Sequence, residues 1–347
     1  MYLKKILITI VLLGLVGMGI FSWYVYTTVF TPNTAFNNTD AHVYIPTDAT
    51  FYEVQQELGP LLDDMESFTA VANRKGYATN VKPGHYILEK GMNNNDIVNA
   101  LRSKNIPIQV KFNNQERLED LAGAIARQIE ADSISLLNAM KDATFLAENE
   151  QNEATALGFY VPNTYEFYWN TSAEGFRDKM ISEYKRFWNE QRLAKAEKLN
   201  MTPTQVVSLA AVVQKETAKV DERKRVAGVY MNRLQRGMLL QADPTVIYAK
   251  KRAENDFDQI IKRVLYKDLE IDSPYNTYKY AGVPPGPIAM PDISSIDAVL
   301  NYEKHDYLYF VANVDNFGYH KFAKTLAQHN RNKAEYVRWI SQQGVNR

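Results

Sequence analysis

The chain has 347 residues, which suggests about two folded units, and its 40 Lys and Arg residues balance its 40 Asp and Glu residues. A net charge of zero argues against a nucleic-acid-binding protein, because such proteins usually carry a basic excess. The lack of cysteine excludes disulfides, thiol nucleophiles, iron–sulfur clusters and cysteine-rich zinc sites.

The N-terminal segment is uniformly apolar, with no charged residue from 6 to 30. As a helix it would be about 37 Å long, enough to cross a bilayer. Lys4 and Lys5 precede it and no basic residue follows closely, which predicts a cytoplasmic tail (1–5), a single transmembrane helix and a chain that continues outside the cytoplasm. A cleaved signal peptide is the alternative, but it would have a shorter apolar region and a small-residue cleavage site. We therefore expect a single-pass protein of the inner or plasma membrane.

The next part of the chain alternates short strands and helices. A polar, turn-prone linker covers residues 31–41. Three strands are expected after it: one at 43–46, one after the Pro-Gly turn in VKPGHYIL, and one at 106–112. Helices are expected from Thr47 and over 65–75, 92–102 and 117–129. This pattern predicts a small α/β module over 42–150 within an α+β protein.

The second half, 151–347, is expected to form a mixed α+β domain. Thr202, Pro203 and Gln205 predict a helix start with a capping box, and the helix should continue through QVVSLAAVVQKETAK. Another helix is expected from Asp221 to a C-terminal Gly237. A hairpin over 307–313 and 319–325 and a last helix from about Lys333 complete the domain.

Glu216 is the most informative residue, because helical spacing places it on an apolar face. It lies about 20° from Leu209 and about 40° from Val212 around the helix axis. Burial disfavours a charged carboxylate, so the pKa of Glu216 should rise toward the range that a general acid needs near neutrality. The alternative is a Glu at the edge of the stripe that reaches solvent or pairs with Arg225 or Arg233.

Two later segments carry clustered polar and aromatic groups. In QADPTVIYA (241–249), Asp243 before a proline is a good N-cap for a short helix. YNTY (275–278) brings two phenols, an amide and a hydroxyl close to the stiff loop GVPPGPI (282–288). Aromatic faces stack on sugar rings and amides bind hydroxyls, so this region suits a carbohydrate groove, although an ordinary packed loop would have the same sequence.

Other catalytic motifs are missing. His320 and His329 are candidates for metal or acid–base roles, but no H-E-x-x-H or similar spacing accompanies them, so hydrogen-bonding roles are expected and no metal is predicted. The exported part contains no Walker loop, G-x-G-x-x-G or G-x-S-x-G motif, which leaves phosphoryl transfer, dinucleotide chemistry and serine-hydrolase chemistry without support.

Several long motifs together resemble the endolytic murein transglycosylase family, also called the YceG-like family. They are GFYVPNTYEFY (158–168), the segments 210–249 and 273–291, and LYFVAN…HKFAKTLAQHN at the end. The resemblance covers about residues 40–340, in the family's order and behind a single anchor. Gln214, Met290 and Tyr319 depart from the family's usual Glu, Asn and Gly.

The resemblance implies a membrane-anchored enzyme that cuts the β-1,4 bond between N-acetylmuramic acid and N-acetylglucosamine within nascent peptidoglycan strands and leaves 1,6-anhydro ends. Glu216 falls at the family's catalytic glutamate, and 151–347 would be the catalytic domain. KPGHY (82–86) matches a turn of a LysM-like module. Cell-wall synthases are expected partners, and no cofactor is implied. The residues expected to line the substrate groove are Gln241, Asp243, Thr245, Tyr275, Asn276 and Tyr278.

One carboxyl group suffices for anhydro formation. It protonates the leaving oxygen and then deprotonates the sugar's own C6 hydroxyl, which attacks C1 intramolecularly. A hydrolase usually needs two carboxylates. Two alternatives stay open: a lysozyme-like hydrolase with Asp243 or Asp221 as the second carboxylate, and a non-catalytic adapter that holds cell-wall enzymes together.

Overall fold

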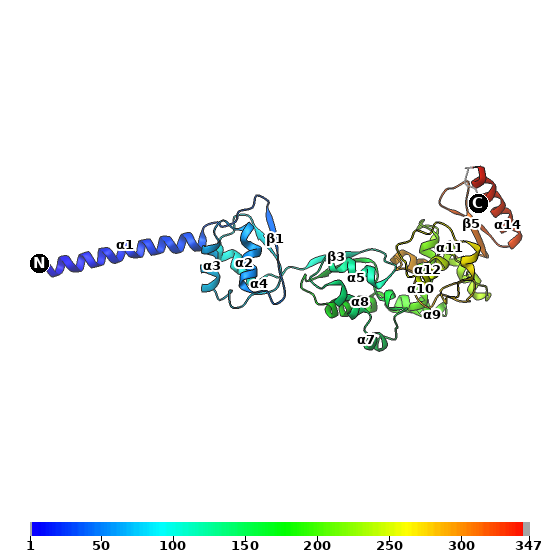
Figure 1. The fold of residues 1–347 in the computed structure, drawn as a ribbon, viewed down its shortest axis with the longest axis horizontal. Coiled ribbons are helices and arrows are strands. Elements are labelled where there is room, and N and C mark those ends of the chain that lie inside the picture. Colours follow the sequence, from blue (N-terminus) through cyan, green and yellow to red (C-terminus); the bar gives the residue numbers. More distant parts are fainter. Residues whose placement is uncertain (1, 343–347) are drawn as a thin grey trace. The chain divides into compact units, whose positions relative to one another are not determined.

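The computed structural model describes residues 2–342, and the chain forms two compact units (Figure 1). Unit 1 contains the residues up to Val110 together with 127–131 and 165–172. Unit 2 contains 111–126, 132–164 and the chain from Ala173 onward. The strands β3 (Ile108–Phe112) and β4 (Asn163–Phe167) pair with each other.

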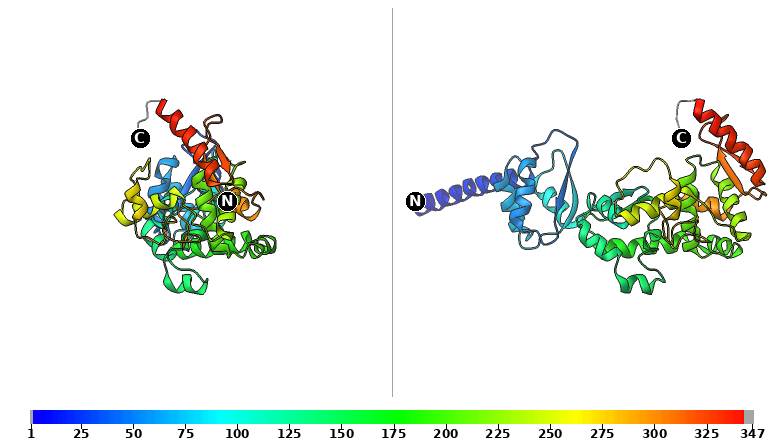
Figure 2. Two further views of the ribbon diagram at one scale, coloured as in Figure 1. Left: turned by 90° about the vertical axis from the view of Figure 1, so that its right-hand side faces the viewer. Right: turned by 45° about the vertical axis from the view of Figure 1, so that its right-hand side comes forward.

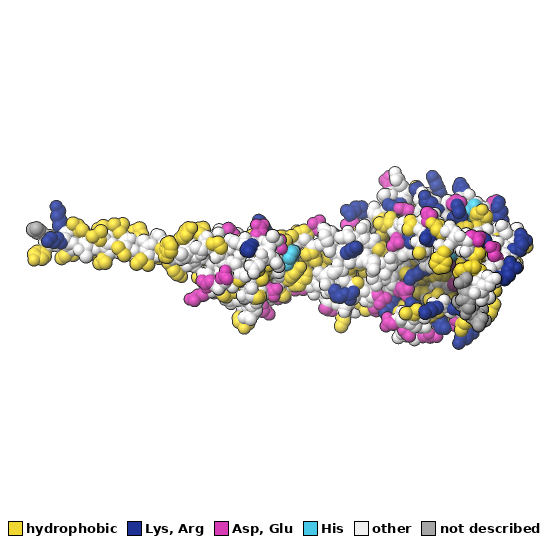
Figure 3. Space-filling model, turned by 90° about the horizontal axis from the view of Figure 1, so that it is seen from above, with side chains coloured by type: hydrophobic (Ala, Val, Ile, Leu, Met, Phe, Trp, Pro, Cys, Tyr) yellow, Lys and Arg dark blue, Asp and Glu magenta, His cyan; other side chains and the backbone are white. Residues whose placement is uncertain are grey.

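The N-terminal helix α1 (Tyr2–Phe30) is long and apolar enough to cross a membrane. Its most apolar stretch has a mean hydropathy of 2.4, and none of it is buried in the protein. Hydrophobic side chains cover its surface along its length (Figure 3). The helix predicted over 6–30 is therefore present and is compatible with a membrane anchor.

Unit 1 is built on an antiparallel pair of strands, β1 (Asp40–Ile45) and β2 (Gly84–Glu89). Residues on their inner faces pack on the helices and form one hydrophobic core. These helices are α2 (Phe51–Leu58), η1 (Gly59–Leu61), α3 (Met65–Arg74) and α4 (Asn94–Ser103). The helix predicted from Thr47 begins later, at Phe51, because Thr50 and Glu53 form a capping box there.

Unit 2 is mostly helical. It contains α5 (Leu118–Ala126), α6 (Ser133–Met140), α7 (Ala143–Glu148), η2 (Ala156–Phe159), α8 (Ala173–Phe187), α9 (Glu190–Lys198), α10 (Pro203–Glu216), α11 (Arg223–Gln235), α12 (Asp243–Glu254), η3 (Tyr266–Glu270) and α13 (Ile293–Leu300). Helices α5 to α7 thus belong to unit 2 although they lie within 42–150. The α+β character is as predicted.

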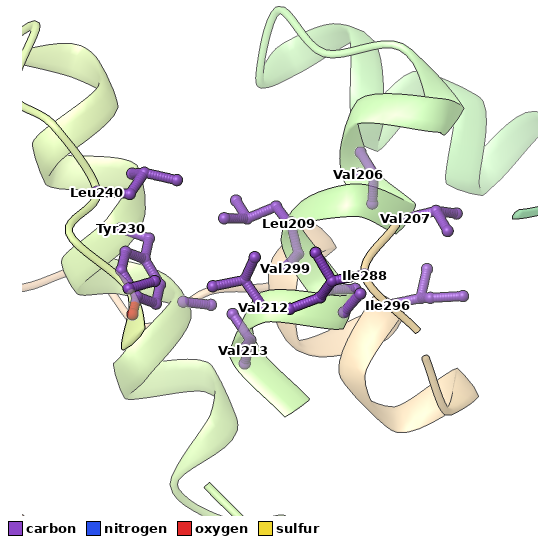
Figure 4. Close-up of a cluster of buried hydrophobic side chains, with 14 of the residues drawn as sticks. Val206, Val207, Leu209, Val212, Val213, Tyr230, Leu240, Ile288, Ile296 and Val299 are labelled. Atoms are coloured by element: carbon purple, nitrogen blue, oxygen red, sulfur yellow. The ribbon is translucent and has the colours of Figure 1, made fainter. Parts of the chain in front are cut away.

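Helix α10 lies at the centre of the core of unit 2. Thr202 caps it, Pro203 is its first residue and Gln205 closes the capping box, as predicted. Every residue from Val206 to Val213 is buried, and the helix contacts α9, α11, α12 and α13. Figure 4 shows its apolar side chains meeting Tyr230, Ile296 and other core residues. This packing fixes the position of the C-terminal end of α10.

The predicted hairpin is formed by β5 (Tyr309–Ala312) and β6 (His320–Ala323), which pair antiparallel. The last helix, α14 (Leu326–Gln342), packs against both strands (Figure 2). It begins earlier than the predicted Lys333, because the Thr325 hydroxyl accepts a hydrogen bond from the backbone N–H of Gln328 and starts the helix there.

Candidate active site

Glu216 is the last residue of α10, and its side chain is half-buried. The hydroxyl of Tyr230, from α11, donates a hydrogen bond of 2.7 Å to Glu216 Oε1. Burial raises the pKa of Glu216 from 4.5 to about 7, although the hydrogen bond from Tyr230 acts in the opposite direction. The negative charge of Asp243 also raises it. At neutral pH a large fraction of this carboxyl group therefore keeps its proton, as a general acid requires.

Neither arginine considered as a partner forms an ion pair with Glu216 within residues 2–342. Arg225 binds the carboxylate of Glu303. Arg233 donates from Nε to the carbonyl oxygen of Leu308 and from Nη1 to that of Leu240. Arg233 is nevertheless near enough to favour the ionised form of Glu216 slightly.

A polar cavity of about 300 Å³ opens on one side of Glu216. Three of the predicted groove residues, Gln241, Asp243 and Tyr278, line it. The hydroxyl of Tyr278 donates a 2.6 Å hydrogen bond to Asp243 Oδ1. The other lining residues are Tyr230, Arg233, Leu240, Tyr309, Phe310, Leu326 and His329. The sequence suggests Arg233 as a partner of Glu216 and His329 as a metal, acid–base or hydrogen-bonding candidate, but sequence reasoning missed the other five as site residues.

Asp243 does not cap α12, so that prediction is wrong. Ala242 is the N-cap residue and makes no side-chain cap, while Asp243 is the first residue of the helix. The backbone N–H of Ala242 binds Thr277 Oγ1 instead. The Asp243 carboxylate is turned toward Tyr278 and the cavity, where it can contact a ligand.

The other three predicted groove residues are buried and do not line this cavity. Thr245 is bonded to Ala242 O and to Thr277 Oγ1. Asn276 donates to two backbone carbonyl oxygens, and Tyr275 lines a different cavity, beside Tyr248. They hold the wall that carries Gln241 and Tyr278, and their direct contact with a substrate stays a prediction.

A second, more apolar cavity of about 480 Å³ also includes Glu216 in its lining. Its other walls come from the residues after α10, from the tip of the hairpin and from α14. They are Thr217, Ala218, Ala312, Asn313, Val314, Phe317, Gly318, Tyr319, His320, Tyr336, Trp339 and Ile340. The carboxyl group of Glu216 thus borders two cavities of different character.

A buried hydrogen-bond network holds the chain just after Glu216. Thr217 Oγ1 donates to Glu222 Oε2 at 3.0 Å, and the backbone N–H and Nδ1 of His320 donate to the same carboxylate at 2.8 Å. Burial would raise the pKa of Glu222, but the hydrogen bonds from His320 outweigh it and lower the pKa. The network ties the end of α10 to β6. It gives His320 a hydrogen-bonding role, and no cluster of three metal-ligating side chains occurs within residues 2–342.

The sequence profile of the YceG-like family matches residues 43–335. This chain belongs to the YceG-like family. The resemblance inferred from its motifs is thereby confirmed.

Relatives of this YceG-like chain carry the name endolytic murein transglycosylase. The one from Bacillus subtilis strain 168 is 31% identical over 320 residues, which cover 87% of this chain and 86% of the relative. The one from Streptococcus pneumoniae strain D39 is 30% identical over 298 residues, or 78% of this chain and 53% of the relative. The predicted enzyme class, a lytic transglycosylase, is the activity that these names give.

The crystal structure of a YceG-like protein from Listeria monocytogenes is also similar. It is 30% identical in sequence, with a TM-score of 0.57, and the match covers 85% of this chain and 99% of that chain. A LysM-like character of unit 1 stays a prediction.

Proposed function

We propose that this chain is a membrane-anchored endolytic lytic transglycosylase of peptidoglycan. Its substrate is the β-1,4 bond between N-acetylmuramic acid and N-acetylglucosamine within nascent strands, and its product carries a 1,6-anhydro end. The names of the relatives support the reaction class. The observation that carries the proposal for this chain is the carboxyl group of Glu216, which has a pKa of about 7 and borders two cavities.

Glu216 performs both proton transfers. Its proton passes to the glycosidic oxygen as the bond from C1 breaks. The resulting carboxylate then takes the proton of the C6 hydroxyl, whose oxygen forms a new bond to C1. Tyr230 binds Oε1, which leaves Oε2 for the substrate and stabilises the carboxylate formed halfway. No water is consumed, so no second carboxylate is needed.

Two cavities around one acid favour cleavage inside a strand, because sugar units then have places on both sides of the cut. Gln241, Asp243 and Tyr278 bind the sugar on the polar side. The wall that carries Gln241 and Tyr278 is held in position by the buried residues Thr245, Tyr275 and Asn276. The side chains of this wall are amide, carboxylate and phenol groups, which suit sugar hydroxyls and acetamides.

The anchor places the reaction at the membrane. With the N-terminus in the cytoplasm, α1 holds the catalytic domain (151–347) outside, close to strands that synthases have just made. The LysM-like module (42–150) lies between the linker and this domain and is proposed to contact glycan. The short linker confines cleavage to nascent strands.

The test is digestion of purified strands by the full-length protein and by Glu216→Gln. Glu174→Gln, which changes an exposed glutamate in α8, is the matched control. The wild type and the control should release internal fragments with anhydro ends, and Glu216→Gln should release none while it stays folded. Retained cleavage by Glu216→Gln would refute the assignment.

The two alternatives give other products. A hydrolase that used Asp243, which shares the polar cavity, would yield ends that have gained water. Asp221, in contrast, is exposed, accepts a hydrogen bond from Tyr319 and lines neither cavity. A non-catalytic adapter would bind strands without making new ends, whichever residue stands at 216.

A further inference from the structure

We propose that α14 and the hairpin tip form a binding subsite for one N-acetylated sugar unit of the glycan, with Trp339 and Phe317 as its aromatic walls. This inference rests on the proposed function and names the part of the protein that holds the strand on the apolar side of Glu216.

The composition of the apolar cavity suits a sugar. Four aromatic residues line it, and the Tyr336 and Trp339 rings stack with their centroids 6.4 Å apart. Phe317 lines the cavity from the hairpin tip, and 86% of its surface is exposed, so its ring is accessible to a ligand. Aromatic rings pack on the C–H faces of sugars and on acetyl methyl groups, and Asn313 adds an amide for a hydroxyl or acetamide.

The course of α14 links the two cavities. Leu326 and His329, in its first turns, line the polar cavity, while Tyr336, Trp339 and Ile340 line the apolar one. From 329 to 336 the helix axis advances by about 10 Å. A glycan that occupies both cavities therefore follows α14, with Glu216 at the junction.

Helix α14 is not part of the hydrophobic core. None of its residues is buried, and it packs on the hairpin strands β5 and β6. Its aromatic side chains are thus not needed to fill the core of unit 2, which forms around α10. A binding role explains why a helix with an exposed surface presents Trp339 and Tyr336 to the cavity.

A sugar is the occupant that the position favours. The cavity includes Glu216 in its lining, so a protein partner seated there would cover the acid and block cleavage. A sugar unit of the same strand would instead be held in register with the bond to be cut. We therefore assign the subsite to the substrate itself.

The experiment measures binding of tetra-N-acetylchitotetraose, a soluble β-1,4-linked N-acetylated oligosaccharide, to the full-length Glu216→Gln protein by calorimetry. When Trp339→Ala or Phe317→Ala is combined with Glu216→Gln, the oligosaccharide should bind about tenfold more weakly, since either change removes an aromatic contact. Tyr266→Ala, which removes an aromatic side chain 88% exposed in η3 and outside both cavities, is the control and should leave affinity unchanged. Trp339→Phe should restore most of the affinity.

A second readout separates binding from catalysis. With Glu216 intact, Trp339→Ala and Phe317→Ala should raise KM for strands about tenfold and leave the pH profile of kcat in place. Unchanged affinity in both variants, an equal loss in Tyr266→Ala, or no binding by the Glu216→Gln parent would overturn the inference. Wild-type protein that failed to cleave strands would instead refute the proposed function.

Discussion

Replacing Glu216 by Gln should stabilise the protein in alkaline solution while it abolishes cleavage. The pKa of Glu216 rises from 4.5 in the unfolded chain to about 7 in the folded protein, chiefly through burial. The stabilising effect of the protonated group is complete below about pH 4.5 and is lost as the pH rises through about 7. At 1.36 kcal/mol for each pH unit between the two pKa values, ionisation costs the fold up to about 3 kcal/mol.

Gln cannot ionise and can still accept the hydrogen bond from Tyr230, so Glu216→Gln avoids this cost. Urea unfolding of the detergent-solubilised full-length protein should show the variant more stable than the wild type at pH 8, by up to about 3 kcal/mol, and nearly equal at pH 4. Glu174→Gln should show no such pH dependence. An equal gain in stability at both pH values, or no gain at pH 8, would refute the raised pKa of Glu216.

Three further substitutions test the surroundings of the acid and the packing of the loop 282–288. Tyr230→Phe removes a hydrogen bond that favours the carboxylate, so the alkaline limb of the cleavage profile should move up by about one pH unit; an unmoved limb would contradict this role. Asp243→Asn removes a charge that raises the pKa of Glu216, so the same limb should move to lower pH; a shift upward would contradict it. Gly286→Ala would place a Cβ 1.9 Å from the backbone oxygen of Ala154. Urea unfolding should therefore show a free energy of unfolding lower by about 1–3 kcal/mol. Unchanged stability would contradict the close packing.

The local features of the fold could be predicted from the sequence because neighbouring residues determine them. Thr202, Pro203 and Gln205 specify the start of α10 within four positions, and the structure has the capping box. The apolar spacing of α10 placed Glu216 on a buried face, and its pKa is raised as expected. The start of α14 was missed because the capping hydroxyl of Thr325 precedes a polar stretch without an apolar stripe.

The partners of the acid could not be predicted, because they come from distant elements. Tyr230 has the spacing of an ordinary core residue on α11, and its hydroxyl meets Glu216 once the two helices pack. Asp243 has the local pattern of an N-cap, but Tyr278 from another loop binds its carboxylate. His320 reaches the end of α10 through Glu222 and β6.

In the proposed mechanism, Glu216 alone drives an intramolecular attack on C1 without water. Digestion of purified strands in water enriched in oxygen-18, followed by mass spectrometry of the new ends, tests it most directly. We predict anhydro ends that carry no label and are lighter by one water than hydrolysed ends, and no new ends with Glu216→Gln. Labelled ends that have gained water would contradict the account.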